Sequence, residues 1–142
     1  MQVKDSTLQK WIPNIDVDRV YDVVEIQWTG CGVHLHLCPD DIKPENRSTK
    51  QLAVCWDNVI CYQVTHESFR PDCWISNPED AWSFFVSSTS EYLASAKENN
   101  PTLPYSLFLF EIVGTNIIVD VLSENYPEIT FDTDRINSHL ME

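Results

Sequence analysis

The sequence predicts an α+β domain in which a mostly antiparallel, twisted sheet of about six strands (β-β-β-β-α-β-β) carries one main helix on one face. Three observations favour this class: short runs rich in aromatic and β-branched residues, turn residues between these runs, and one stretch with apolar residues at helical spacing. The 142 residues suit a single domain that covers residues 1–142. The sequence lacks the regular strand and helix alternation of a parallel barrel or a dinucleotide-binding fold.

The densest apolar run extends from Tyr105 to Phe131, and we expect the rest of the chain to pack around it. It contains two predicted strands, 105–113 and 117–123, joined by a turn that begins at Gly114. Both strands are apolar on both faces. We therefore expect this hairpin to lie centrally in a sheet, with other parts of the chain covering its faces.

Four earlier segments are predicted to form two further hairpins. Segments 20–28 and 33–38 flank a turn at residues 29–32, and segments 51–56 and 59–66 flank a tight turn at Asp57-Asn58. In the first strand, alternation predicts one face with Val24, Ile26 and Trp28 and an opposite face with Val23, Glu25 and Gln27. In the second strand, it predicts one face with Val33, Leu35 and Leu37 and an opposite face with His34, His36 and Cys38.

The main helix is predicted to start at Pro78, with Asn77 as its N-cap, and to end at Asn99-Asn100-Pro101. Its expected buried stripe consists of Trp82, Phe85, Val86, Thr89, Leu93 and Ala96. Ser88 and Glu91 have the spacing of a capping box, so two short helices in series are an alternative.

The remaining segments are expected to be irregular or short. They are a lead-in or short helix at 1–19, loops at 39–50 and 67–78 with Trp74 and Ile75 entering the core, a bend at Pro127, a brief strand at 129–131, and a helix or tail at 132–142.

Net charge is the strongest global feature of the chain. The formal charge is −13: residues 1–70 hold ten acidic and seven basic side chains, and residues 71–142 hold twelve acidic side chains with Lys97 and Arg135. The second half therefore repels nucleic acid and anionic membranes and favours a basic partner. Alternatively, acidic surfaces serve only to keep soluble proteins apart.

The cysteines indicate the compartment. The chain has five cysteines and no apolar leader segment at its N-terminus, which predicts reduced thiols and a cytoplasmic location. No run of residues approaches the length of a membrane span. We expect no cofactor.

Metal binding is an alternative that the sequence leaves open. His34, His36 and Cys38 alternate along a predicted strand, so their side chains share one face and could hold zinc. A further ligand could come from one of five residues: Cys31, Cys55, Cys61, Cys73 or His66.

An enzyme is not expected. Three glycines leave little material for an oxyanion loop or a phosphate cradle, and the sequence has no P-loop, Gly-x-Ser-x-Gly or His-Glu-x-x-His motif. A thiol enzyme that uses a cysteine beside a histidine remains an alternative.

Carboxylates are the preferred candidates for a functional surface. The predicted partner-binding residues follow or flank the apolar hairpin, and they are Asp120, Glu124, Tyr126, Glu128, Asp132 and Asp134. Aromatic anchors within a charged rim are typical of protein interfaces, which favours Tyr126 and Trp74 as anchors. Alternatively, this is a solvated acidic end with Tyr126 in the core.

The chain is small and acidic, its predicted helix carries Trp82 and Phe85, and the segment IIVDVLSENYPEI (117–129) follows. In these features it resembles the immunity proteins that accompany bacterial polymorphic and contact-dependent toxins. The likeness lies in size, charge and general style, and it assigns no residue roles. It implies a stoichiometric inhibitor that binds a toxin domain, often a basic nuclease, and occludes its active site. The sequence thus predicts a non-catalytic protein with a basic protein partner; an adaptor domain is the other interaction-protein alternative.

Overall fold

The computed structural model describes residues 7–13, 20–39, 51–69, 82–104 and 106–131. The strands of these residues are β1 (Gln9–Lys10), β2 (Tyr21–Trp28), β3 (Val33–Pro39), β4 (Leu52–Trp56), β5 (Cys61–His66), β6 (Phe84–Ser87), β7 (Phe108–Val113), β8 (Ile117–Ser123) and β9 (Glu128–Phe131). One α-helix, α1 (Glu91–Asn99), and one 3-10 helix, η2 (Glu67–Phe69), complete the described part.

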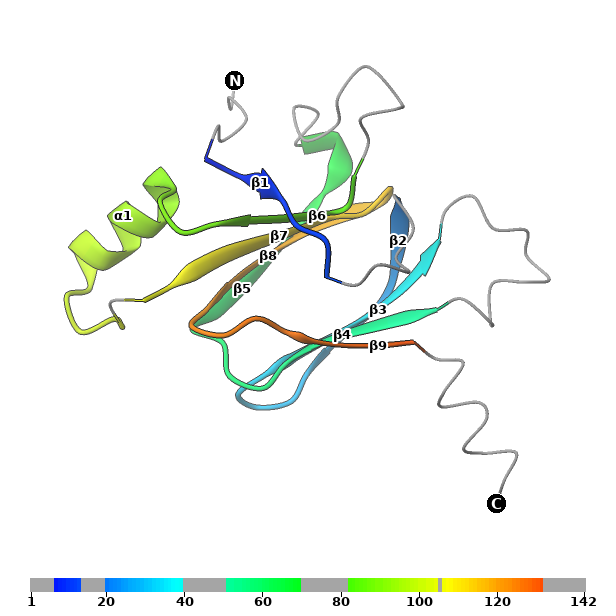
Figure 1. The fold of residues 1–142 in the computed structure, drawn as a ribbon, viewed down its shortest axis with the longest axis horizontal. Helices are drawn as coiled ribbons and strands as arrows, with labels where there is room; N and C mark the ends of the chain where they lie inside the picture. The colour runs from blue at the N-terminus through cyan, green and yellow to red at the C-terminus, as the bar shows by residue number, and fades with distance from the viewer. Residues whose placement is uncertain (1–6, 14–19, 40–50, 70–81, 105, 132–142) are drawn as a thin grey trace.

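The strands form two antiparallel sheets rather than the single sheet of about six strands that was predicted (Figure 1). Sheet A has the order β1-β6-β7-β8-β5, and sheet B has the order β2-β3-β4-β9. The fold is therefore a β-rich α+β fold with more strands than expected. The predicted brief strand at 129–131 is β9; the other two additional strands are β1, which lies in the predicted lead-in, and β6, which lies in the predicted helix.

The main core lies between the two sheets, because the largest buried cluster takes residues from both. Leu35 and Leu37 of β3 and Trp56 of β4 meet Phe110 of β7 and Phe84 of β6 in this cluster. The predicted alternation of β3 is confirmed: Val33, Leu35 and Leu37 are 0% exposed, and His34 and His36 on the opposite face are half-buried.

The predicted central hairpin is confirmed. Strands β7 and β8 occupy interior positions of sheet A, and five of the six residues of β7 are buried. One face of the hairpin packs against sheet B, and the other packs against α1 through Leu93, which clusters with Leu109 and Leu122. The strand sequence is apolar on both faces because both faces are covered.

The predicted faces of β2 are wrong over its first half. The register with β3 shifts between Val23 and Glu25, so Val24 is an extra residue and is 53% exposed, whereas Val23 is 4% exposed. A bulge of this kind moves every residue after it to the other face. Val23 therefore shares the core face with Ile26, which packs against the main core.

The predicted hairpin around Asp57-Asn58 is also wrong. Strand β4 pairs with β3 and β9 in sheet B, whereas β5 pairs with β8 in sheet A. The connection between them crosses from one sheet to the other, and backbone hydrogen bonds from Val59 N to Cys31 O (2.9 Å) and from Ile60 N to Leu122 O (2.8 Å) fix it.

The predicted long helix is replaced by a strand and a short helix. Phe84 to Ser87 pair with β7, and Phe84 and Phe85 are buried on opposite faces of sheet A, which suits consecutive aromatic residues in a covered strand. The helix begins only after Ser90, whose Oγ accepts a hydrogen bond from Leu93 N (3.1 Å). The expected cap at Asn77 and the expected core residues Trp74 and Ile75 lie outside the described residues.

Candidate functional site

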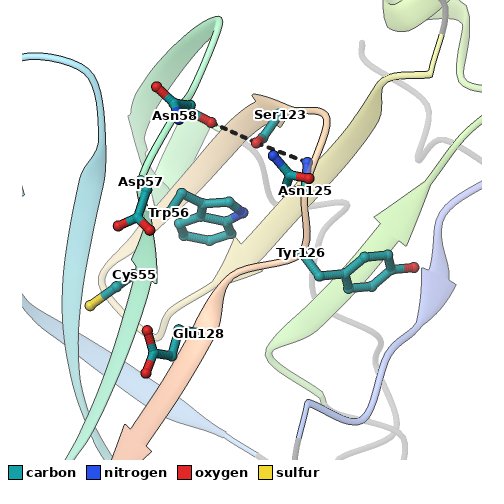
Figure 2. A pocket seen from close by; sticks show the side chains of 8 residues that line it. All are labelled: Cys55, Trp56, Asp57, Asn58, Ser123, Asn125, Tyr126 and Glu128. Carbon is teal, nitrogen blue, oxygen red and sulfur yellow. Dashed lines mark hydrogen bonds between the residues drawn. The ribbon is translucent and has the colours of Figure 1, made fainter.

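The site is built where β4 leaves sheet B and β8 leaves sheet A, at one end of the two-sheet sandwich. A short link, 124–127, carries the chain from β8 to β9 beside the β4–β5 connection. Ser123 is fully buried and joins the two segments: its Oγ donates to Asn58 O (2.7 Å) and accepts from Asn125 N (3.2 Å), as Figure 2 shows. The two segments are thereby held side by side.

A cavity of about 210 Å³ lies between these segments. It is lined by Cys55, Trp56, Asp57, Asn58, Ser123, Asn125, Tyr126 and Glu128 (Figure 2). At roughly 30 Å³ for each water, this volume corresponds to roughly seven waters or to the end of one long side chain. The cavity is therefore large enough for a single side chain of a partner, and it is smaller than the roughly 300–1,000 Å³ typical of small-molecule sites.

Trp56, one of the lining residues, carries a buried hydrogen-bond donor. Its side chain is 1% exposed, and its Nε1 has no hydrogen-bond partner among the residues that the structure describes. In Figure 2 the indole nitrogen points toward the side of Asn125 and Tyr126. A buried donor left unpaired costs about 1–3 kcal/mol, so this nitrogen lowers the stability of the fold.

Tyr126 is both a core residue and a surface residue. Its ring packs against Trp11 (5.5 Å between centroids), Phe108 (5.1 Å) and Phe110 (5.1 Å), while the residue is 50% exposed. These contacts hold one side of the ring in place and leave the rest open. Both interpretations of Tyr126 drawn from the sequence therefore describe part of its environment.

Acidic residues lie at one side of the cavity: in Figure 2 the carboxylates of Asp57 and Glu128 lie on the side of Cys55, away from the ring of Tyr126. Asp57 and Glu128 line it, and Glu124 lies in the same link, between Ser123 and Asn125; all three acidic residues are exposed. The structure therefore brings together Glu124, Tyr126 and Glu128 of the predicted site. We call Asp57, Glu124, Tyr126 and Glu128 the acidic end.

Asp57 is the residue that sequence reasoning missed. It precedes Glu124 by 67 positions (124 − 57), and it was interpreted only as a turn residue. Its position at the acidic end depends on β4 pairing with β9, because that pairing sets Cys55 opposite Glu128. No local pattern in the sequence signals this pairing.

Asp120 lies apart from the acidic end. It belongs to the face of sheet A that is opposite the main core, and it is directly across from Gln63 on β5 and from Glu111 on β7, which is 3% exposed. The pKa of Tyr92 is raised above its ordinary value, mainly because the side chain is partly buried and further because the Cys61 thiol and the Asp120 carboxylate lie nearby. Asp132 and Asp134, the other predicted residues, lie outside the described residues.

The histidine face does not form a metal site in the described part of the chain. His34 lies across from Cys55, and His36 lies across from Glu25. Among the residues described, however, no three His, Cys, Asp or Glu side chains are placed to hold a metal ion. None of the four described cysteines, Cys31, Cys38, Cys55 and Cys61, forms a disulfide in the structure.

Comparison with other proteins adds no assignment. The chain matches no protein-family model, no curated protein and no solved structure. Among the described residues, no helix is both long and apolar enough to cross a membrane.

Proposed function

We propose that this chain is a non-catalytic cytoplasmic protein that binds and neutralises a basic protein partner through its acidic end, in the manner of an immunity protein that occludes the active site of a toxin. One observation carries the proposal: the exposed residues Asp57 and Glu128, from two distant parts of the chain, both line the cavity, and Glu124 and the half-exposed Tyr126 lie in the adjoining link. Aromatic anchors beside charged groups are typical of tight protein interfaces.

The cavity suits a cationic side chain. An arginine or lysine of the partner that enters it meets the carboxylates of Asp57 and Glu128, which both line the cavity. Charge pairs of this kind fix the register of the two proteins.

Long-range electrostatics support the same partner class. Residues 71–142 contribute −10 to the formal charge (twelve acidic and two basic side chains), which speeds the approach of a basic protein. A nuclease must present cationic groups to phosphate. An acidic end that pairs with those groups therefore competes with the nucleic acid for the same site.

The test uses two variants of equal charge. The first, the acidic-end variant, combines Asp57→Asn, Glu124→Gln and Glu128→Gln. The control variant combines Glu25→Gln, Glu91→Gln and Glu98→Gln, which are exposed carboxylates of β2 and α1 that do not line the cavity. Each variant removes three negative charges, from −13 to −10, so the two differ in position alone.

Tagged full-length chain is used to recover its partner from the native cells, and the activity of the purified partner is then assayed with each protein. We expect the wild type and the control variant to inhibit at a ratio of one to one, and the acidic-end variant to inhibit only at much higher concentration. A partner that is not basic, or one whose activity is unaffected by saturating wild type, would overturn the proposal and favour an adaptor.

A further inference from the structure

The strand pairing that supports the acidic end stops short of most of its residues. The last pair between β4 and β9 joins Cys55 to Glu128. Residues 57–60 follow β4, and the link 124–127 precedes β9, so neither segment belongs to a strand. Segments of this kind are the first parts of a protein to open unless other bonds hold them.

Ser123 supplies such bonds to both segments. It is the last residue of β8, its side chain is 0% exposed, and its hydroxyl lies between the two segments (Figure 2). The Oγ donates to Asn58 O (2.7 Å) in the β4–β5 connection and accepts from Asn125 N (3.2 Å) in the link. One buried hydroxyl thus uses its donor on one segment and an acceptor lone pair on the other.

Two acidic residues depend on this backbone for their placement. Asp57 directly precedes Asn58, and Glu124 directly follows Ser123. Within the described residues, the carboxylates of Asp57 and Glu124 make no hydrogen bond or ion pair that would hold them in place. The position of each carboxylate is therefore set by the backbone segment that carries it.

We propose that the Ser123 hydroxyl is a positioning group, which fixes the acidic end in one conformation before any partner binds. The consequence for binding rests on the proposed function, whereas the fixing of the two segments does not. A surface that is already ordered avoids the entropy cost of ordering it on association. Ser123 thereby strengthens binding although it carries no charge and, being fully buried, does not touch the partner.

Hydrogen exchange of the full-length protein, followed residue by residue by NMR, tests the fixing without a partner. The Asn125 amide is the reporter because it donates to Ser123 Oγ. In the wild type we expect it to exchange roughly a hundredfold more slowly, or slower still, than in an unfolded chain. Ser123→Ala should bring its exchange to within about tenfold of the unfolded rate, because the acceptor is lost.

Ser83→Ala is the matched control. Ser83 is also fully buried, and its Oγ accepts from a backbone amide of a distant segment, Tyr21 N (2.9 Å). It lies at the other end of sheet A, where its carbonyl accepts from Val113, the last residue of β7. Both substitutions leave the net charge at −13, and the control should leave the Asn125 amide protected.

Titration calorimetry with the purified basic partner tests the consequence for binding. Ser123→Ala should raise the dissociation constant roughly tenfold, because the partner must then order the two segments. Ser83→Ala should change it less than about threefold, since it leaves the acidic end in place. Denaturant unfolding confirms that both variants are folded under the conditions of the assay.

The possible results separate this proposal from the proposed function. Exchange of the wild-type Asn125 amide at the unfolded rate would overturn the positioning role without any variant. Equal dissociation constants for Ser123→Ala and Ser83→Ala, on a partner that the wild type binds, would also overturn it and leave the proposed function intact. A wild type that binds no basic partner would remove the proposed function, and the exchange rates would still decide whether Ser123 fixes the two segments.

Discussion

The side chain of Asn116 fastens the two sheets together, and its removal gives a sharp test of the fold. It lies in the turn between β7 and β8 of sheet A, and it binds the backbone of Val23 in sheet B twice. Its Oδ1 accepts from Val23 N (3.2 Å), and its Nδ2 donates to Val23 O (2.8 Å). Val23 is the last regular residue before the bulge in β2, so Asn116 satisfies backbone groups that the interrupted ladder leaves over.

The expected magnitude follows from these two bonds. A hydrogen bond contributes about 0.5–1.5 kcal/mol to stability, so Asn116→Ala should lower the free energy of unfolding by about 1–3 kcal/mol. For a domain of this size, that loss lowers the melting temperature by about 3–9 °C. Denaturant unfolding followed by tryptophan fluorescence measures the first quantity, and differential scanning calorimetry measures the second.

Asn116→Asp separates the two bonds. At neutral pH the carboxylate still accepts from Val23 N, but its second oxygen faces Val23 O, and two acceptors repel. We expect this variant to be at least as unstable as Asn116→Ala. The facing carbonyl raises the pKa of the new carboxyl in the folded state, so stability relative to wild type should recover as pH falls through that pKa and be lost as pH rises through it.

Two results would refute this reasoning. One is an Asn116→Ala protein within about 0.5 kcal/mol of wild type, the range usual for surface changes without structural consequence. The other is an Asn116→Asp protein with wild-type stability at neutral pH, which would mean that the turn does not hold Val23 through both atoms.

Three further changes test other parts of the fold. Gly32→Ala should lower the free energy of unfolding by more than roughly 2 kcal/mol, because the added Cβ would lie 2.2 Å from the backbone oxygen of Trp56. Denaturant unfolding measures the loss, and a variant as stable as wild type would contradict the geometry. Ser90→Ala removes the hydrogen bond to Leu93 N and should cost about 1 kcal/mol, and Ser90→Asp should restore most of it. The raised pKa of Tyr92 means that the folded state favours its neutral form, so its contribution to stability is fully present below the unfolded pKa of 10.0 and is lost as pH rises through the folded value. Tyr92→Phe should therefore unfold less readily than wild type in alkali. Parallel stability–pH profiles of the two proteins would exclude this role.

Local patterns predicted much of the strand content, because alternation of period two survives wherever one face is buried. Val33, Leu35 and Leu37 illustrate this, since each is fully buried. The pattern failed at Val24, where a bulge shifts the faces by one residue. The helical spacing failed at Phe85 and Val86, which belong to a strand that is covered on both faces.

Pairing between distant strands could not be predicted from neighbouring residues. The sequence places β4 and β5 next to each other and suggests a hairpin, but the two strands join different sheets. The pairing of β4 with β9 likewise places Asp57 near Glu128 and the link that holds Tyr126. Counting charges along the chain grouped Asp120 with these residues, although alternation along β8 sets it on the side of sheet A away from the main core.

The central claim, that the acidic end binds a basic partner, is tested most directly by titration calorimetry of that purified partner with the two variants of equal charge. We expect the acidic-end variant to raise the dissociation constant roughly a hundredfold at low salt, because close charge pairs contribute several kcal/mol of coupling. The control variant should change it less than about threefold, since distant exposed charges act only through screened attraction. Equal weakening by both variants, or none by either, would contradict the claim.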